Sequence, residues 1–249
     1  MARLSAIPLH TDDNSGARLS RLGQLRALTS ALDAKALLSF ALKEAFPGKI
    51  AVVSSFAAES VVLLHLVAEI DPETPILFLN TGKLFGETLR YRDRLQDVLG
   101  LTDIRAIGPH PIDRQTRDPE GTLWSRDPDA CCHFRKTTPL ARALSGFDAL
   151  ITGRKRFQTA TRATMEKIEP VDGRYRFNPL IDWPLEALER HIESHKLPTH
   201  PLVHDGYPSI GCMPCTRRVR AGESYRAGRW AGLEKDECGM HVGIDGERI

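Results

Sequence analysis

Short apolar runs alternate along the chain with segments in which apolar residues recur at helical spacing. Runs of four or five apolar, often β-branched residues have the length of buried strands, and spacings of three and four indicate amphipathic helices. We predict strands at 50–53, 76–79, 103–107 and 149–152, and helices at 34–46, 61–70, 87–99, 139–144 and 185–196. This alternation predicts an α/β fold with a doubly wound, mostly parallel sheet.

Three regions differ in composition. Residues 1–30 are a polar lead-in, 31–221 carry the strand and helix pattern of a single α/β domain, and 222–249 hold six glycines in 28 residues. We expect the last region to be a flexible tail without a core element. Residues 109–128 contain four prolines and are expected to form an irregular insert.

Charge and hydropathy exclude several classes of protein. Lys plus Arg number 34 and Asp plus Glu 32, a net charge of +2, which does not indicate a broad nucleic-acid-binding surface. No apolar run approaches the roughly 18 residues that span a bilayer, and the N-terminus lacks the apolar core of a secretory signal. We therefore expect a soluble, cytoplasmic protein with no membrane or nucleic-acid partner.

Five cysteines fall into three groups, namely the adjacent Cys131 and Cys132, the C-x-x-C pair Cys212 and Cys215, and the isolated Cys238. In a reducing compartment, such grouping suggests a metal or redox site. Adjacent side chains diverge and fit one tetrahedral zinc ion poorly, whereas thiolates around an iron–sulfur cluster reach different irons. The pattern favours a cluster, with zinc or incidental core cysteines as alternatives. Cys238, among glycines, is either an unselected free thiol or a mobile nucleophile.

Loops after the predicted strands should meet at one edge of the sheet, because ligands of doubly wound sheets bind at the carboxyl ends of strands. These loops are 54–60, 80–82 and the segment after 152. The first is a small-residue loop that opens a helix and can offer backbone N–H groups to an anion, although it is not a Walker motif. Basic residues flank the cysteines and this edge, and they suit a small dianion. They include Arg135, Lys136, Arg154, Lys155, Arg156, Arg162, Arg217, Arg218, Arg226 and Arg229.

Several motifs together resemble one enzyme family. The most specific are CCHFRK at 131–136, GYPSIGCMPCTR at 206–217 and ECGMH at 237–241, with support from 54–60, LNTG at 79–82 and GRKRFQ at 153–158. Over about 50–241 the chain resembles the assimilatory adenylyl-sulfate (APS) reductases, within the wider group of APS and phosphoadenylyl-sulfate (PAPS) reductases.

This resemblance implies an adenine-nucleotide-binding fold akin to the ATP pyrophosphatases and a [4Fe–4S] cluster held by Cys131, Cys132, Cys212 and Cys215. It implies that Cys238 attacks the sulfur of adenylyl sulfate, releasing AMP and leaving a thiosulfonate. Thioredoxin or a glutaredoxin-like dithiol then frees sulfite. Lys136 is predicted to act between the cluster and the substrate. The predicted substrate-binding residues are Ser54, Ser55, Phe56, Glu59, Ser60, Asn80, Thr81, Gly82, Arg154, Arg156, Arg162, Arg226 and Arg229.

Other functions remain open at this point. Family members with both cysteine pairs mainly use APS, but PAPS reduction or dual use is an alternative. An ATP pyrophosphatase-type adenylating or thiolating enzyme would share the fold but normally carries a Ser-Gly-Gly-x-Asp-Ser loop, which is absent here. A zinc-stabilised binding module would have no use for the ECGMH segment. We also expect a homo-oligomer.

Overall fold

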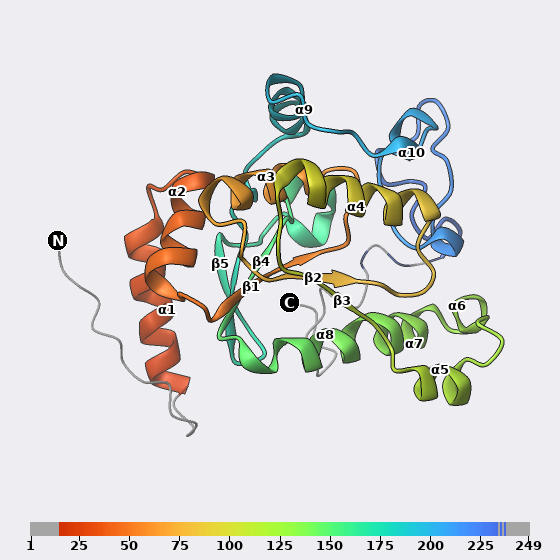
Figure 1. Cartoon of the computed structure of the whole chain (residues 1–249), viewed down its shortest axis with the longest axis horizontal. Coiled ribbons are helices and arrows are strands. Elements are labelled where there is room, and N and C mark those ends of the chain that lie inside the picture. The colour runs from red at the N-terminus through yellow and green to blue at the C-terminus, as the bar shows by residue number, and fades with distance from the viewer. Residues whose placement is uncertain (1–14, 234, 236, 238–249) are drawn as a thin grey trace.

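The computed structural model describes residues 15–233, 235 and 237 (Figure 1). Its centre is a six-stranded sheet with the strand order β3-β2-β1-β4-β6-β5. All neighbouring strands are parallel except β5, which pairs antiparallel with β6. The strands are β1 (Ile50–Ser54), β2 (Ile76–Leu79), β3 (Ile104–Ile107), β4 (Ala149–Thr152), β5 (Ile168–Val171) and β6 (Arg174–Phe177). The predicted fold class is confirmed, and among these strands only the β5–β6 hairpin was not predicted.

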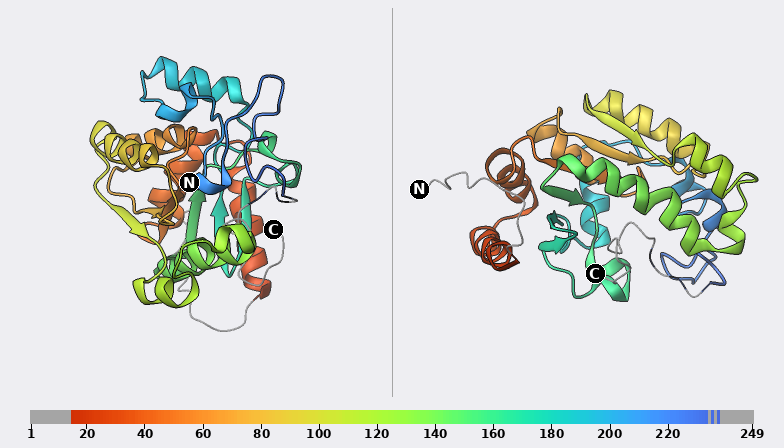
Figure 2. Two further views of the ribbon diagram at one scale, coloured as in Figure 1. Left: turned by 90° about the vertical axis from the view of Figure 1, so that its right-hand side faces the viewer. Right: turned by 90° about the horizontal axis from the view of Figure 1, so that it is seen from below.

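Helices cover both faces of the sheet. α3 and α4 lie over one face and α8 over the other (Figures 1 and 2). None of the helices in the described part of the chain has the length and apolar character needed to cross a membrane. The α-helices are α1 (Ser15–Thr29), α2 (Ala34–Ser39), α3 (Ser60–Ile70), α4 (Gly86–Leu99), α5 (Pro111–Arg117), α6 (Leu123–Arg126), α7 (Pro128–Cys132), α8 (Thr138–Ala143), α9 (Leu185–Ser194) and α10 (Pro201–His204). Two π-helical turns continue α2 and α7, at Phe40–Ala45 and His133–Thr137.

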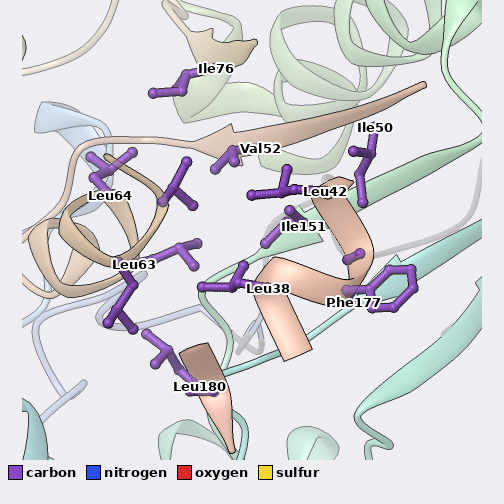
Figure 3. Close-up of a cluster of buried hydrophobic side chains, with 14 of the residues drawn as sticks. Leu38, Leu42, Ile50, Val52, Leu63, Leu64, Ile76, Ile151, Phe177 and Leu180 are labelled. Atoms are coloured by element: carbon purple, nitrogen blue, oxygen red, sulfur yellow. The ribbon is translucent and has the colours of Figure 1, made fainter. Parts of the chain in front are cut away.

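The apolar strands divide their side chains between two cores, because successive residues of a strand point to opposite faces. In β1, Ile50 and Val52 belong to the larger core under α2 and α3, which Figure 3 shows. Ala51 and Val53 belong to a smaller core that Leu140 of α8 covers. Both faces of β1 are therefore buried from solvent, as expected for a central strand of a parallel sheet.

Part of the polar lead-in at 1–30 forms a helix that was not predicted from the sequence. Helix α1 occupies Ser15–Thr29, with Leu22 and Leu25 buried against the larger core. Arg26 donates from Nε to the carbonyl of Ile168 at 3.0 Å, which ties the helix to β5. The helix places only two leucines in the core, Leu22 and Leu25, and so weak an apolar pattern is easily missed in a polar segment.

The proline-rich insert is also more regular than expected. Prolines begin α5 and α7 rather than interrupting them, since the first turn of a helix does not need their missing N–H. The Asp127 side chain accepts a hydrogen bond from the Ala130 N–H at 2.9 Å and caps α7. The insert thereby fixes where α7 begins, and α7 ends in the predicted cluster ligands.

The segment after Gly222 holds a core residue, contrary to expectation. Trp230 is only 3% exposed and packs with Cys132 and Cys215. The Arg217 N–H donates to the Gly228 carbonyl at 2.9 Å, and a Cβ at Gly228 would lie 2.2 Å from the Arg217 oxygen. A glycine is therefore required for this close approach. The mobility predicted for 222–249 stays a prediction.

Candidate active site

A pocket opens at the carboxyl ends of β1, β2 and β4, where the sequence analysis expects the loops to meet. Among the described residues, six cationic and two acidic side chains line it, so its charge suits an anion. The predicted site residues that line the pocket are Ser54, Ser55, Glu59, Ser60, Thr81, Lys136, Arg154, Arg162, Cys212, Arg226 and Arg229.

The loop after β1 makes a sharp turn into α3. Phe56 has φ of 52°, in the left-handed region, and its N–H donates to the Ser54 hydroxyl at 3.1 Å. Its ring is fully buried edge-on against Phe78, at 5.2 Å between centroids. Burial of this ring stabilises a backbone conformation that non-glycine residues rarely adopt. Phe56 therefore shapes the loop and does not line the pocket.

Glu59 is the centre of a buried polar cluster on one pocket wall. Its carboxylate accepts hydrogen bonds from Lys155, from Tyr225 and, at 2.7 Å, from Gln158. Burial opposes ionisation of Glu59, but the Lys155 ammonium and the hydrogen bonds hold its pKa below the usual range. Lys155 was grouped with the basic residues of this edge but was not predicted to bind substrate, and neither were Gln158 and Tyr225. The sequence signals were the position of Lys155 between two predicted arginines and that of Gln158 at the end of the GRKRFQ motif.

Arg154 is bound by a carboxylate of the β5–β6 hairpin. Glu169 accepts from Arg154 at 2.8 Å, from Arg176 at 3.0 Å and from Asn178 at 2.8 Å. Burial is the main cause that lowers the pKa of Arg154, to about 9, and the nearby Arg176 charge adds to it. Two guanidinium groups thus share one carboxylate, which leaves a net positive charge beside the pocket.

Arg162 reaches a residue close to the end of the described chain. Its Nε and NH2 both donate to the Glu237 carboxylate, the second at 2.7 Å. Thr159 donates to the same carboxylate at 2.9 Å. Burial raises the pKa of Glu237, but the hydrogen bonds and charge of Arg162 more than offset this and lower it overall. Glu237 was not among the predicted site residues. It immediately precedes Cys238, which lies outside the described residues.

Arg229 lies flat against the backbone of the segment before Cys212. It donates to the Ile210 carbonyl at 3.1 Å, and its guanidinium lies 4.5 Å from the Trp230 ring centroid. A Cβ on Gly211 would approach the Arg229 guanidinium to 2.2 Å. The absence of a side chain at Gly211 therefore lets Arg229 reach the pocket.

The four predicted cluster ligands are free thiols that come together from two segments. Cys131 and Cys132 end α7, while Cys212 precedes and Cys215 ends the single 3₁₀ turn Met213–Cys215. Burial raises the pKa of Cys131 to about 11, and the charge of Cys132 contributes next. Burial also raises the pKa of Cys215, with Cys212 and Cys132 as further causes, whereas Lys136 and Arg229 oppose the rise. These couplings indicate a shared thiol site with cations beside it.

The residues around the thiols include polar groups that a bound group could contact. No set of three Cys, His, Asp or Glu side chains in the described ranges gathers as closely as a single metal ion requires. Thr81 Oγ1 lies 3.3 Å from Cys212 Sγ. Trp230 packs against Cys132, and its buried indole N–H has no hydrogen-bond partner among the residues that the structure describes. Such a donor is costly unless a bound group accepts from it, and the sulfur atoms of a cluster would do so.

Three further predicted substrate residues lie away from the pocket lining. Arg156 is partly exposed and pairs with Asp182, and it donates to the Met165 carbonyl at 2.9 Å. Asn80 accepts from the Gly82 N–H at 3.2 Å, so these two residues form the turn after β2. The structure therefore does not support Arg156, Asn80 or Gly82 as substrate contacts. Arg156 is directed to the surface, and the turn residues serve to present Thr81.

Comparison with known proteins places this arrangement in a family. The model of the phosphoadenosine phosphosulfate reductase domain matches residues 49–218. The chain belongs to the phosphoadenosine phosphosulfate reductase family. A relative from Mesorhizobium japonicum named adenosine 5'-phosphosulfate reductase is 46% identical over 233 residues, which cover 94% of this chain and 92% of the relative. One of the same name from Chelativorans is 48% identical over 195 residues, covering 78% and 80%.

Solved structures agree on the fold. A phosphoadenylyl-sulfate reductase from Candida auris, in a phosphate complex, has a TM-score of 0.69 and 21% identity, covering 86% of this chain and 100% of that one. A Candida glabrata FMN adenylyltransferase has a TM-score of 0.54 and 14% identity, covering 88% and 73%. At such identities they show the fold alone. The resemblance to the APS and PAPS reductases is confirmed, and the phosphoadenylyl-sulfate reductase from Candida auris shares the fold described above.

Proposed function

We propose that the protein reduces adenylyl sulfate to sulfite and AMP in sulfate assimilation, with Cys238 as nucleophile and an external dithiol as reductant. One observation carries the proposal. A single cation-rich pocket holds both Cys212, from the thiol group, and Glu237, the neighbour of Cys238 in sequence. The relatives named adenosine 5'-phosphosulfate reductase support the choice of substrate.

Adenylyl sulfate would bind with its anionic end toward the cations of the pocket. Lys136 and Arg229 line it on the side of the thiol group. Arg226 lines it near Glu59 and Glu237, and Arg154 lines it at the end of β4. Charge-assisted hydrogen bonds to phosphate and sulfate oxygens are short and strong in such a site. The adenosine would lie over Ser55 and Ser60, where the loop after β1 opens α3.

The chemistry follows from a thiolate and a good leaving group. The Cys238 sulfur attacks the sulfur of the sulfate group, and the bond from that sulfur to the bridging oxygen breaks. AMP leaves with both electrons of that bond, and a sulfonate remains on Cys238. The surrounding cations stabilise the negative charge on the departing phosphate.

The second half-reaction consumes a dithiol such as thioredoxin or a glutaredoxin-like protein. One thiolate attacks the Cys238 sulfur and releases sulfite, leaving a mixed disulfide. The second thiol of the donor then attacks this disulfide, which regenerates the Cys238 thiol and oxidises the donor. The two electrons therefore come from the donor, and this chemistry suits the cytoplasm, where thiols stay reduced.

Cys131, Cys132, Cys212 and Cys215 would hold a [4Fe–4S] cluster, as the family resemblance and the buried thiol site support. When bound, the cluster would join α7 to the 212–215 turn and set a local charge. Lys136 lines the pocket and also acts electrostatically on Cys215. It is therefore suited to bridge the thiol site and the bound anion.

The test is anaerobic incubation of the protein with sulfur-labelled adenylyl sulfate, followed by intact mass and peptide mapping. We expect one labelled sulfonate on Cys238 and stoichiometric AMP. Cys238→Ser should bind AMP normally and release no sulfite. Turnover by Cys238→Ser at a substantial rate would exclude this mechanism. Labelling by phosphoadenylyl sulfate but not by adenylyl sulfate would show that phosphoadenylyl sulfate is the substrate instead. Iron and zinc analysis of the same sample tests the cluster.

A further inference from the structure

Two separated parts of the C-terminal region are linked to each other through hydrogen bonds of the 155–162 loop. Tyr225 donates to Glu59, which also accepts from Gln158 at 2.7 Å. Twelve residues further along, Glu237 accepts from Arg162. Gln158 Oε1 in turn accepts from Arg162 NH1. A continuous chain of hydrogen bonds therefore links the start and the end of the segment 225–237 through the 155–162 loop.

The contact at Glu237 has the geometry of a specific docking site. The Nε and NH2 of Arg162 present two parallel donors, the arrangement that binds a carboxylate most selectively. Thr159 adds a third hydrogen bond at 2.9 Å. The Arg162 and Glu237 side chains are only 7% and 14% exposed. Solvent competes weakly with a pair so shielded, and Gln158 holds the same guanidinium by accepting a hydrogen bond from Arg162 NH1.

This contact changes the role of Arg162. The edge of its guanidinium that would best bind a phosphate or sulfate is occupied by a residue of the chain itself. We propose that Glu237 is a positioning residue, which docks on Arg162 and Thr159 and thereby holds the next residue, Cys238, at the substrate pocket. Its importance for catalysis rests on the proposed function, in which Cys238 is the nucleophile.

A positioning role for Glu237 predicts a different mutant phenotype from that of the pocket cations that bind the anionic substrate. Its carboxylate cannot attract an anionic substrate, and adjacent residues lie about 3.8 Å apart along the backbone. Docking Glu237 therefore limits where Cys238 can go. Loss of the docking contact should lower the rate of thiolate attack, because the effective concentration of the nucleophile falls, while nucleotide affinity is kept.

The experiment compares Glu237→Gln with a matched control, Glu223→Gln, in the full chain. Glu223 lies two residues before the segment 225–237 and pairs with Arg217, and neither residue lines the pocket. The first readout is single-turnover formation of the Cys238 sulfonate. We expect Glu237→Gln to slow it at least tenfold with AMP Kd within threefold of the parent, and Glu223→Gln to leave both unchanged. Thr159→Val, which keeps the charges, should slow it two- to fivefold.

A second readout does not depend on catalysis. Lys235 has a side chain that is only 10% exposed, and trypsin cleavage after it reports release of the docked segment. Glu237→Gln should be cleaved at least fivefold faster than the parent. Parent-like cleavage and sulfonation rates in Glu237→Gln would overturn the proposal, as would an equal effect of Glu223→Gln or a loss of AMP affinity matching the loss of rate. Absence of a sulfonate in the parent would refute the proposed function. The rate of trypsin cleavage after Lys235 would then be the measurement that tests whether Glu237 docks on Arg162.

Discussion

The Glu169 carboxylate offers a test of how the hairpin β5–β6 supports the pocket. Replacing it by Gln keeps the size of the side chain and removes one negative charge. Glu169 Oε2 accepts from Arg154 at 2.8 Å and from Arg176 at 3.0 Å, and these two arginine side chains are each 3% exposed. The substitution therefore leaves two buried guanidinium groups with no carboxylate between them.

The expected cost follows from this burial. Removing one partner of a buried, hydrogen-bonded ion pair typically destabilises a protein by about 3–5 kcal/mol, because an uncompensated charge remains. In a chain near 250 residues each kcal/mol corresponds to about 2 °C in Tm, so Glu169→Gln should unfold about 6–10 °C lower. The control is Asp182→Asn, whose pair with Arg156 is 52% and 37% exposed. It should change stability by about 0.5 kcal/mol or less.

The assay is urea unfolding followed by tryptophan fluorescence, with a thermal scan of the same samples. A common slope for parent and variant would show that the same surface is exposed on unfolding. A loss under about 1 kcal/mol in Glu169→Gln would refute the reasoning, because it would mean that water or a rearranged side chain already compensates these arginines. An equal loss in Asp182→Asn would refute it too, since exposed and buried pairs would then count alike.

Three further predictions concern the site and the pH dependence of stability. Arg229→Ala should raise the KM for adenylyl sulfate roughly tenfold or more, since a charge-assisted contact contributes about 1.5–3 kcal/mol; Arg156→Ala, outside the pocket, should leave KM unchanged. Lys136→Ala should lose most of kcat/KM in sulfite-release assays yet keep the iron content of the parent, and loss of iron would instead make Lys136 a structural residue. His200 is fully buried, bonded to Thr88 at 3.0 Å, and burial lowers its pKa from 6.5 to about 4. The unfolded chain therefore takes up this proton first as pH falls, and stability should drop by up to about 3 kcal/mol between pH 6.5 and 4. Urea unfolding across this range should show a shallower drop in His200→Asn, and an unchanged pH profile would count against this histidine.

The parts of the fold that the sequence predicted are those whose burial follows from apolar side chains alone. β1, β2 and β4 are continuous apolar runs, so their position in a parallel sheet could be read directly. β5 and β6 were missed because Glu169 and Arg176 interrupt the pattern. Both side chains are buried, and the ion pair between them offsets the cost of removing their charges from water. A contact between residues on two strands cannot be read from the sequence pattern.

The site divides in the same way. The pocket could be placed because parallel strands bring their carboxyl ends together, and Ser55, Thr81 and Arg229 line it as expected. The run Arg154-Lys155-Arg156 gave three equal cations, yet the first two are buried and the third pairs with Asp182. Glu237 was missed because its partner is 75 residues away along the chain.

Helix α1 has a consequence for self-association. β5 is the last strand of the sheet, and an open strand edge is a template on which a second chain can pair and aggregate. Arg26 of α1 already occupies the carbonyl of Ile168 on that strand, and Tyr175 of β6 donates to the carbonyl of Arg18 at 3.3 Å. The helix acts as a cover for the sheet edge. A fragment that begins after residue 30 would keep every described pocket residue but lose this helix. The exposed β5 edges of two such fragments could then pair with each other.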